Sequence, residues 1–244
     1  MKKILLSSVC VAAMSASALA ADMAPRPMYK APPLAAPPQF SWTGCYVGGN
    51  AGYGMAARTW NTTVTTGVTG PASQHTSGGG FVGGGQLGCD YQTGSWVFGI
   101  EGMVDGSTIN YNTSIGAILP GASLNDKVTS FETATGRVGW AVDRSLFYVK
   151  GGVAWEQTSG AINAPAPFSS ESHSADNSGW LLGGGFEYAF SPQWSGKVEY
   201  DYMGFDNRTI AYPLTTAGTV TFTHQNLQTI LAGLNYRFNL DMPH

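Results

Sequence analysis

Beyond its first twenty residues, this 244-residue sequence lacks any long apolar run, and it is poor in charge and in cysteine. No later segment approaches about 18 consecutive apolar residues, which excludes a membrane-spanning helix in the mature chain. Charged residues make up only 11%, against about 25% in soluble domains. Something other than water should therefore cover much of the surface, and the remaining alternatives are a soluble exported protein or a membrane β-barrel.

Low net charge and scarce cysteine exclude further classes of protein. The formal net charge is −3, which gives no case for binding nucleic acid. Only Cys45 and Cys89 lie beyond the leader, too few for a disulfide framework and without zinc-ligand spacing. Glycine, by contrast, is abundant at 33 residues, in clusters that do not lead from a strand into a helix with the Lys or Ser/Thr of a phosphate loop. We interpret these clusters as packing glycines.

The N-terminal residues 1–20 have the three parts of a secretory signal peptide. Lys2 and Lys3 form a basic region, residues 4–14 an apolar region, and residues 18–20 an A-x-A cleavage site. The apolar region is too short for a membrane anchor. The proline-rich residues 21–41 predict an extended linker, either structureless or available to a periplasmic partner.

From residue 42 onward, eight runs alternate between apolar and polar residues, each about ten or more residues long, as a tilted membrane strand requires. In one run Trp96, Phe98 and Ile100 share a face opposite Glu101. The other residues assigned to lipid-facing positions include Cys45, Val47, Tyr53, Phe81, Leu87, Cys89, Val138, Trp140, Phe147, Val149, Trp180, Leu182, Trp194, Val198, Ile230, Leu234, Tyr236 and Phe238. The opposite faces carry Tyr46, Asn50, Gln86, Asp90, Arg137, Tyr148, Lys150, Glu156, Glu187, Lys197, Glu199, Asp201, Asn235 and Arg237.

The connections between the runs alternate between tight turns and long polar stretches, the latter at 59–77, 106–127, 158–178 and 204–222. Aromatic residues, Trp42 among them, lie at the ends of the runs near the tight turns, as in a membrane-interface girdle. The sequence thus predicts an all-β protein, an eight-stranded antiparallel up-and-down transmembrane β-barrel over residues 42–238, with short periplasmic turns and four long outer loops. A soluble β-sandwich is the alternative, but the polar faces are rich in glycine and carry few charges.

The segments WTGCYVGGNAGYG, GGGQLGCDYQ, TGRVGWAVDRSLFYVKGGVAW, GWLLGGGFEYAF and LAGLNYRF resemble the porin-like small outer-membrane proteins of alphaproteobacteria, the outer-membrane immunogenic protein family of Brucella and rhizobia. The resemblance implies a barrel of the outer membrane that maintains envelope integrity, exposes surface loops and catalyses nothing. Two departures stand out: Leu231 occupies an inward position where the family pattern has a polar or basic residue, and residues 239–244 extend the chain past Phe238.

The inward charges predict a network of ion pairs in the lumen, because interleaved cations make ion pairing more favourable than a metal cluster of the acids. Its predicted members are Glu101, Arg137, Lys150, Glu187, Lys197, Glu199, Asp201 and Arg237. Cys45 and Cys89 lie at similar heights on neighbouring strands in an oxidising compartment, where they form either a disulfide or two apolar thiols.

No catalytic, cofactor or metal site is expected. His75 and His173 have serine neighbours, but in Ser/Thr-rich stretches where such neighbours arise from composition. The expected function is a non-enzymatic envelope barrel; the alternatives are a narrow passive pore and a lipid-modifying enzyme at the outer leaflet. The expected partners are outer-membrane lipid and lipopolysaccharide, and the outer-membrane assembly machinery, which would bind the strand that ends at Phe238.

Overall fold

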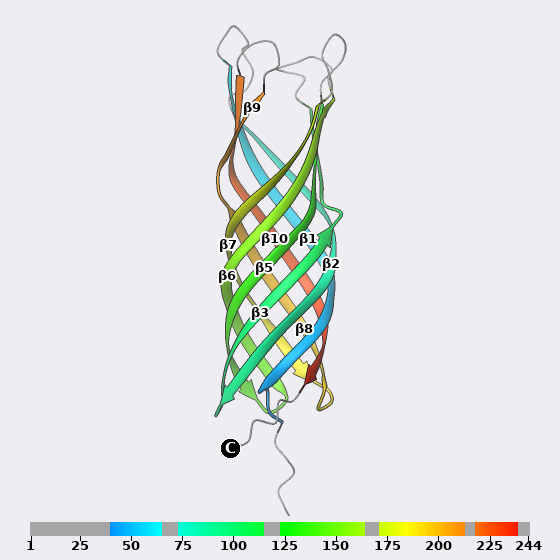
Figure 1. The fold of residues 1–244 in the computed structure, drawn as a ribbon, viewed down its shortest axis with the longest axis vertical. Helices are drawn as coiled ribbons and strands as arrows, with labels where there is room; N and C mark the ends of the chain where they lie inside the picture. Colours follow the sequence, from blue (N-terminus) through cyan, green and yellow to red (C-terminus); the bar gives the residue numbers. More distant parts are fainter. Residues whose placement is uncertain (1–39, 65–72, 115–122, 164–170, 213–217, 239–244) are drawn as a thin grey trace, which may run out of the picture. The chain divides into compact units, whose positions relative to one another are not determined.

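The computed structural model describes residues 40–64, 73–114, 123–163, 171–212 and 218–238, and its regular elements are all strands (Figure 1). The strands are β1 (Gly44–Val64), β2 (Ser73–Thr93), β3 (Trp96–Ser107), β4 (Asn110–Ser114), β5 (Ser123–Val142), β6 (Ser145–Asn163), β7 (Glu171–Ala189), β8 (Trp194–Phe205), β9 (Arg208–Tyr212) and β10 (Gly218–Phe238). Among these residues no helix has the length and apolar character to cross a membrane. The predicted signal peptide, residues 21–39 of the predicted linker, and the tail lie outside the described residues.

All the strands belong to one antiparallel sheet in the order β1-β2-β3-β5-β6-β7-β8-β10, and β1 pairs with β10 to close it. The two short strands add no new position around the ring, because β4 follows β3 alongside β5 and β9 follows β8 alongside β10. The predicted eight-stranded antiparallel barrel is therefore confirmed. In Figure 1 the strands are strongly tilted, as closure of a barrel requires.

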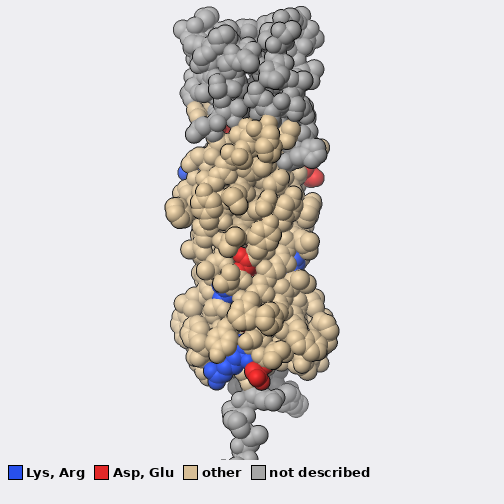
Figure 2. All heavy atoms as spheres, turned by 180° about the vertical axis from the view of Figure 1, so that it is seen from behind, with Lys and Arg blue, Asp and Glu red and all other residues tan. Residues whose placement is uncertain are grey.

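Side chains alternate between the exterior and the interior along each strand, as the period of two predicts. Phe81, Leu87 and Ile100 are 75%, 66% and 68% exposed, whereas Glu101 and Lys150 are only 3% and 2% exposed. Figure 2 shows that charged side chains are sparse over most of one outer face and that several gather at its lower end. The exterior is therefore an apolar surface that suits lipid, and the interior holds the charge.

The end of the barrel with tight turns, which we name the turn end, carries paired aromatic rings on its exterior. The Trp96 and Trp140 rings contact edge to face at 4.9 Å, and Tyr236 lies between Trp194 and Phe238 at 5.2 and 5.0 Å. Trp42 is an exception to the predicted girdle, because it is fully buried inside the barrel. That prediction was wrong because residue 42 has the same parity as the inward-facing Tyr46, so continued alternation directs its side chain into the lumen.

The opposite end, which we name the loop end, differs from the sequence-based expectation. Much of the sequence assigned to long outer loops is strand, since β1 continues to Val64, β6 to Asn163 and β10 begins at Gly218. The exterior there is polar, with Thr129 and Ser159 hydroxyls 3.2 Å apart. The sequence-based prediction recognised strands by their apolar outer face. It therefore missed the parts of the strands that extend past the lipid, where ladder pairing continues.

Glycines on the strands make room for large inward side chains. A Cβ atom at Gly185 would lie 2.7 Å from the Tyr148 hydroxyl, and one at Gly88 would overlap the Tyr46 hydroxyl. The two tyrosines can therefore lie against the inner wall and direct their hydroxyls toward the charged residues described next. These contacts agree with the interpretation of the clusters as packing glycines.

Candidate functional site

The centre of the lumen holds two lysines bound to two glutamates from across the barrel. Lys150 Nζ lies 2.6 Å from Glu199 Oε1 and 3.2 Å from Glu101 Oε1. Lys197 Nζ lies 3.0 Å from Glu101 Oε2 and 3.3 Å from Glu199 Oε2. Tyr46 and Tyr148 donate hydrogen bonds to the same two carboxylates. Strands β3, β6 and β8 are thus joined through the interior.

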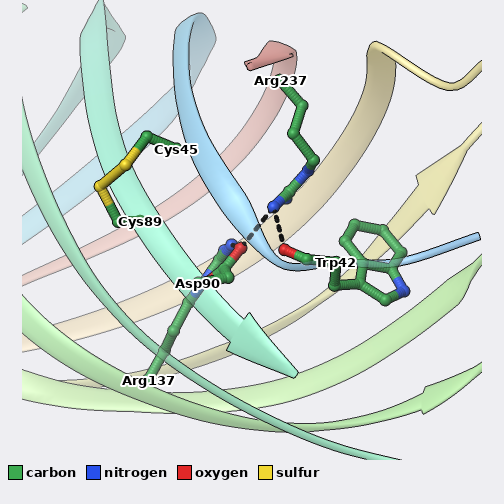
Figure 3. Close-up of a disulfide and its surroundings, with 6 residues drawn as sticks. All are labelled: Trp42, Cys45, Cys89, Asp90, Arg137 and Arg237. Carbon is green, nitrogen blue, oxygen red and sulfur yellow. Dashed lines mark hydrogen bonds and ion pairs between the residues drawn. A yellow bond between two sulfur atoms is a disulfide. The ribbon is translucent and has the colours of Figure 1, made fainter. Parts of the chain in front are cut away.

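Two arginines and two acids form a second group nearer the turn end, and Figure 3 shows both arginines and one of the acids, Asp90. Arg137 donates from Nε and Nη2 to the two oxygens of Asp90, and Arg237 Nη1 donates to Asp90 Oδ2 at 2.8 Å. Both guanidinium groups also approach Glu187, at 3.3 and 3.5 Å. Buried charges of this kind are stable only when paired and hydrogen-bonded, and here each carboxylate has two cationic partners.

Trp42 closes the lumen at the turn end. Its backbone oxygen accepts a hydrogen bond from Arg237 Nη1 at 2.6 Å, and the Arg237 guanidinium lies 4.9 Å from the indole ring centre. The Trp42 amide donates to Gln92 Oε1 at 2.7 Å. Phe40 packs on the apolar cluster that contains Trp42 and Leu146. The residues that precede β1 therefore enter the barrel mouth and fill it.

An apolar cluster fills the lumen on the loop-end side of the lysines. Phe131, Met203 and Leu231 have no exposed surface and belong to this cluster. Its other members are Ala56, Val82, Met103, Ile109, Tyr111, Val128, Ala154, Leu181, Phe205 and Leu227. Leu231, where the resemblance implies a polar or basic residue, packs among apolar neighbours.

A smaller charged group lies beyond the apolar cluster toward the loop end. Arg58 bridges Asp126 at 3.3 Å and Glu156 at 3.2 Å, and its guanidinium lies 4.6 Å from the Tyr111 ring centre. Sequence reasoning did not find this group, because Asp126 falls in a stretch assigned to a loop and Arg58 lies just before another. Continued alternation past the apolar face was the signal that could have located both residues.

Two carboxyl groups are less well matched than the others. Asp105 is fully buried on β3, where it has no ion pair among the described residues and the neutral Asn50 is its hydrogen-bonding neighbour. Asp201 lies 3.2 Å from Lys150, but its oxygens lack a well-aligned hydrogen bond. In the turn-end half of the lumen six buried carboxyls face four cations: the acids Asp90, Glu101, Asp105, Glu187, Glu199 and Asp201, and the bases Arg137, Lys150, Lys197 and Arg237.

All eight residues predicted to form the lumen network lie inside the barrel within ion-pair distance of an opposite charge. Asp90 was assigned to the interior but not to the network, although it binds both arginines. Asp105 was missed altogether. In the ladder between β2 and β3, Asp90 pairs with Gly99, which in turn pairs with Arg137 on β5. Because this glycine has no side chain, the Arg137 side chain can lie over it and reach Asp90.

The described histidine side chain gives no support for catalysis. His75 lies on the exterior of β2 with Nδ1 3.4 Å from the Thr59 hydroxyl. The side chains of His173 and His224, and the whole of His244, lie outside the described part of the structure. Within that part, no group of three His, Cys, Asp or Glu side chains is placed to hold a metal ion.

Cys45 and Cys89 form a disulfide across β1 and β2, on the opposite side of the sheet from Asp90 and Arg237 (Figure 3). The two residues are direct partners in the ladder between these strands. Similar height on neighbouring strands was the basis on which the sequence suggested this pair.

The family described as outer membrane protein beta-barrel domain matches residues 6–238, which include every described residue. The chain belongs to this outer-membrane β-barrel family. Two outer-membrane immunogenic proteins are similar over almost the whole chain: a 31 kDa protein of Brucella melitensis is 33% identical and a 25 kDa protein of Brucella canis is 28% identical. The alignments cover 98% of this chain in both cases, with 100% and 99% of the respective relatives.

Among solved structures, OprG from Pseudomonas aeruginosa has 14% sequence identity and a TM-score of 0.47, over 83% of this chain and 99% of its own. Membership of the family locates the protein in the outer membrane. In outer-membrane barrels short turns face the periplasm and long connections face outward. Trp42 and the Asp90 group therefore lie at the periplasmic end, and the Arg58 group lies toward the outside.

Proposed function

We propose that this outer-membrane barrel is non-enzymatic, that it supports the integrity of the envelope, and that it displays its outer connections at the cell surface. The observation that carries the proposal is the filled lumen: ion pairs, an apolar cluster and a second group of ion pairs follow one another along the barrel. Interactions of this kind join opposite walls of the barrel. They support the proposal that the barrel is a rigid scaffold for display.

Three features favour this role over a passive pore. An eight-stranded barrel has room for little more than its own side chains. Here the lysines and glutamates of the central layer are buried, and Phe131, Met203 and Leu231 pack beyond them toward the loop end. An ion on this path would have to give up its hydration and displace these packed apolar side chains, which is costly.

The names of the two Brucella relatives support display at the surface, since those proteins are called immunogenic. A lipid-modifying enzyme is the less favoured alternative. The described residues place His75 against Thr59 on the exterior, without the carboxylate that would orient a catalytic histidine. Lipid and lipopolysaccharide around the apolar belt, and assembly machinery at the β10 strand that ends in Phe238, are the proposed partners.

Planar-bilayer recording of the purified full chain tests the closed lumen. We expect no steady ion current from the wild type. The Arg137→Ala variant should leak more than the wild type, because Asp90 and Glu187 lose one cation each and the water that the remaining carboxylates admit loosens the packing of the neighbouring apolar cluster. Lys127→Ala, which removes an exposed cation outside the lumen, is the matched control and should stay closed. A steady wild-type current that Arg137→Ala leaves unchanged would favour the pore.

Envelope support is tested in cells that lack the protein. We expect such cells to become sensitive to detergent and to leak periplasmic protein, and the wild-type chain to restore resistance. A variant with its outer connections shortened should also restore resistance while abolishing antibody binding to intact cells. Normal resistance in the deletion strain would contradict the proposed role in integrity.

A further inference from the structure

The Cys45–Cys89 disulfide lies on the outer side of the sheet, between direct ladder partners of β1 and β2. Cys45 is the ladder partner of Phe238 on β10, and Cys89 is the ladder partner of Ile100 on β3. Residues paired across a ladder point to the same side of the sheet, and both of these apolar side chains lie on the exterior, 48% and 68% exposed. The disulfide therefore lies on the lipid-facing exterior, between Phe238 of the turn-end aromatic group and the more central Ile100.

Disulfide chemistry cannot proceed readily in such a setting. A disulfide forms or breaks when a thiolate attacks a sulfur atom through a mixed-disulfide intermediate. The thiolate is an ion, and hydrocarbon disfavours ions strongly. Water-soluble oxidants and reductants are also kept away from the two sulfur atoms by the acyl chains.

We propose that Cys45 and Cys89 are oxidised in the periplasm before the barrel inserts, and that the bilayer then protects the bond from exchange. One protein thiolate attacks a disulfide of a periplasmic oxidant, forms a mixed disulfide and releases one oxidant thiolate. The second protein thiolate attacks the first protein sulfur and releases the other. Two electrons pass to the oxidant, and the two thiol protons leave with its dithiol. A thiol-oxidation reaction thus precedes membrane insertion of this chain.

The composition of β1 and β2 explains what early oxidation contributes. Register is weakly specified in glycine-rich strands, because few side chains distinguish one pairing from the next. Here Gly49 pairs with Gly85, and Ala51 pairs with Gly83. A bond between Cys45 and Cys89 fixes the register of these strands before β1 meets β10. It does so at the turn end, where β1 begins and β10 finishes.

The order of events can be measured with the reduced full mature chain, refolded from urea into dilauroylphosphatidylcholine vesicles. Oxidised glutathione is added either before the vesicles or after insertion, and free thiols are then counted with a polyethylene-glycol maleimide on gels. We expect rapid oxidation in the first order and at least about tenfold slower oxidation in the second. Heat-shifted electrophoretic mobility verifies that the reduced chain has inserted.

The matched control moves the pair along the same two strands. Thr59 and His75 are direct ladder partners on β1 and β2, each fourteen residues from the native cysteine and on the same face, but beyond the apolar belt. In a Cys45→Ser/Cys89→Ser background, Thr59→Cys/His75→Cys should oxidise at similar rates in both orders. A water-soluble phosphine should reduce this pair in vesicles but spare the native disulfide until the protein is boiled.

Oxidation of the native pair at equal rates before and after insertion would overturn the proposal, provided that the control pair also reacts. Reduction of the native disulfide by the phosphine in intact vesicles would overturn it as well. The register argument predicts that the oxidised chain inserts faster than the reduced chain. Insertion that is slower after oxidation would contradict that part.

Discussion

Arg137 donates two hydrogen bonds to Asp90, with Nε 2.8 Å from Oδ1 and Nη2 bound to Oδ2. The planar fork of the guanidinium matches the carboxylate, and such two-point pairs are the strong ones. The same arginine also contacts Glu187 and lies over the rings of Tyr46 and Tyr148. It therefore joins β5 to β2, β7, β1 and β6 at a single point in the lumen.

Replacing this arginine should be costly. Removing one partner of a buried ion pair typically costs about 3 to 5 kcal/mol, because the other charge stays buried without compensation. We expect Arg137→Ala to lower the free energy of unfolding by an amount in that range. Urea unfolding in vesicles measures it, with Lys127→Ala as the exposed control that should change stability little. Equal effects of the two substitutions would show that the lumen network does not stabilise the barrel.

Neutralising Asp105 should have the opposite effect on the free energy of unfolding. Its carboxylate is fully buried and has no ion pair among the described residues, and its hydrogen-bonding neighbour Asn50 is neutral. A buried charge without an opposite charge beside it is strongly destabilising. We expect Asp105→Asn, which keeps the shape and removes the charge, to raise the free energy of unfolding.

The control for that substitution is Asp90→Asn, the same chemical change at a carboxyl that binds two arginines. It should destabilise the barrel, because Arg137 and Arg237 lose their shared anion. Both variants can be compared by the same urea titration. Destabilisation by Asp105→Asn as large as that by Asp90→Asn would mean that Asp105 has an anionic role in the lumen.

Val198 tests the lipid-facing exterior. It is 57% exposed on β8, between the buried Lys197 and Glu199. A cation on the lipid face near the middle of the bilayer costs about 2 to 4 kcal/mol. We expect Val198→Arg to reduce the inserted, heat-shifted fraction in vesicles. Ser159→Arg, also outward but beyond the apolar belt, should insert as the wild type does; normal insertion of Val198→Arg would argue against a lipid-facing position.

The sequence was sufficient to predict the barrel and the side of the sheet on which each run places its residues, because a period of two assigns every second side chain to one face. It also located Arg137, Lys150 and Lys197 in the lumen. It did not show that Asp90 joins two arginines, since that depends on the register between strands. Trp42 was misassigned because aromatic type was given more weight than parity.

The part of the barrel nearest the loop end escaped prediction for a different reason. Membrane strands were recognised by their apolar outer face, and this signal ends where the lipid ends. Past Trp155 the exterior of β6 is polar, but its ladder with β5 continues to Asn163. Pairing between neighbouring strands, which a single sequence does not display, maintains the structure there.

The length of these polar strand ends determines how far the barrel wall extends beyond the lipid. From Trp155, the last large apolar side chain on the exterior of β6, the strand continues for eight residues to Asn163. At about 3.3 Å per residue and a tilt of about 40°, that is a height of roughly 20 Å. The described wall of β6 thus extends well beyond the apolar exterior, so a macromolecule that approaches the cell from outside would meet polar strand before it meets lipid.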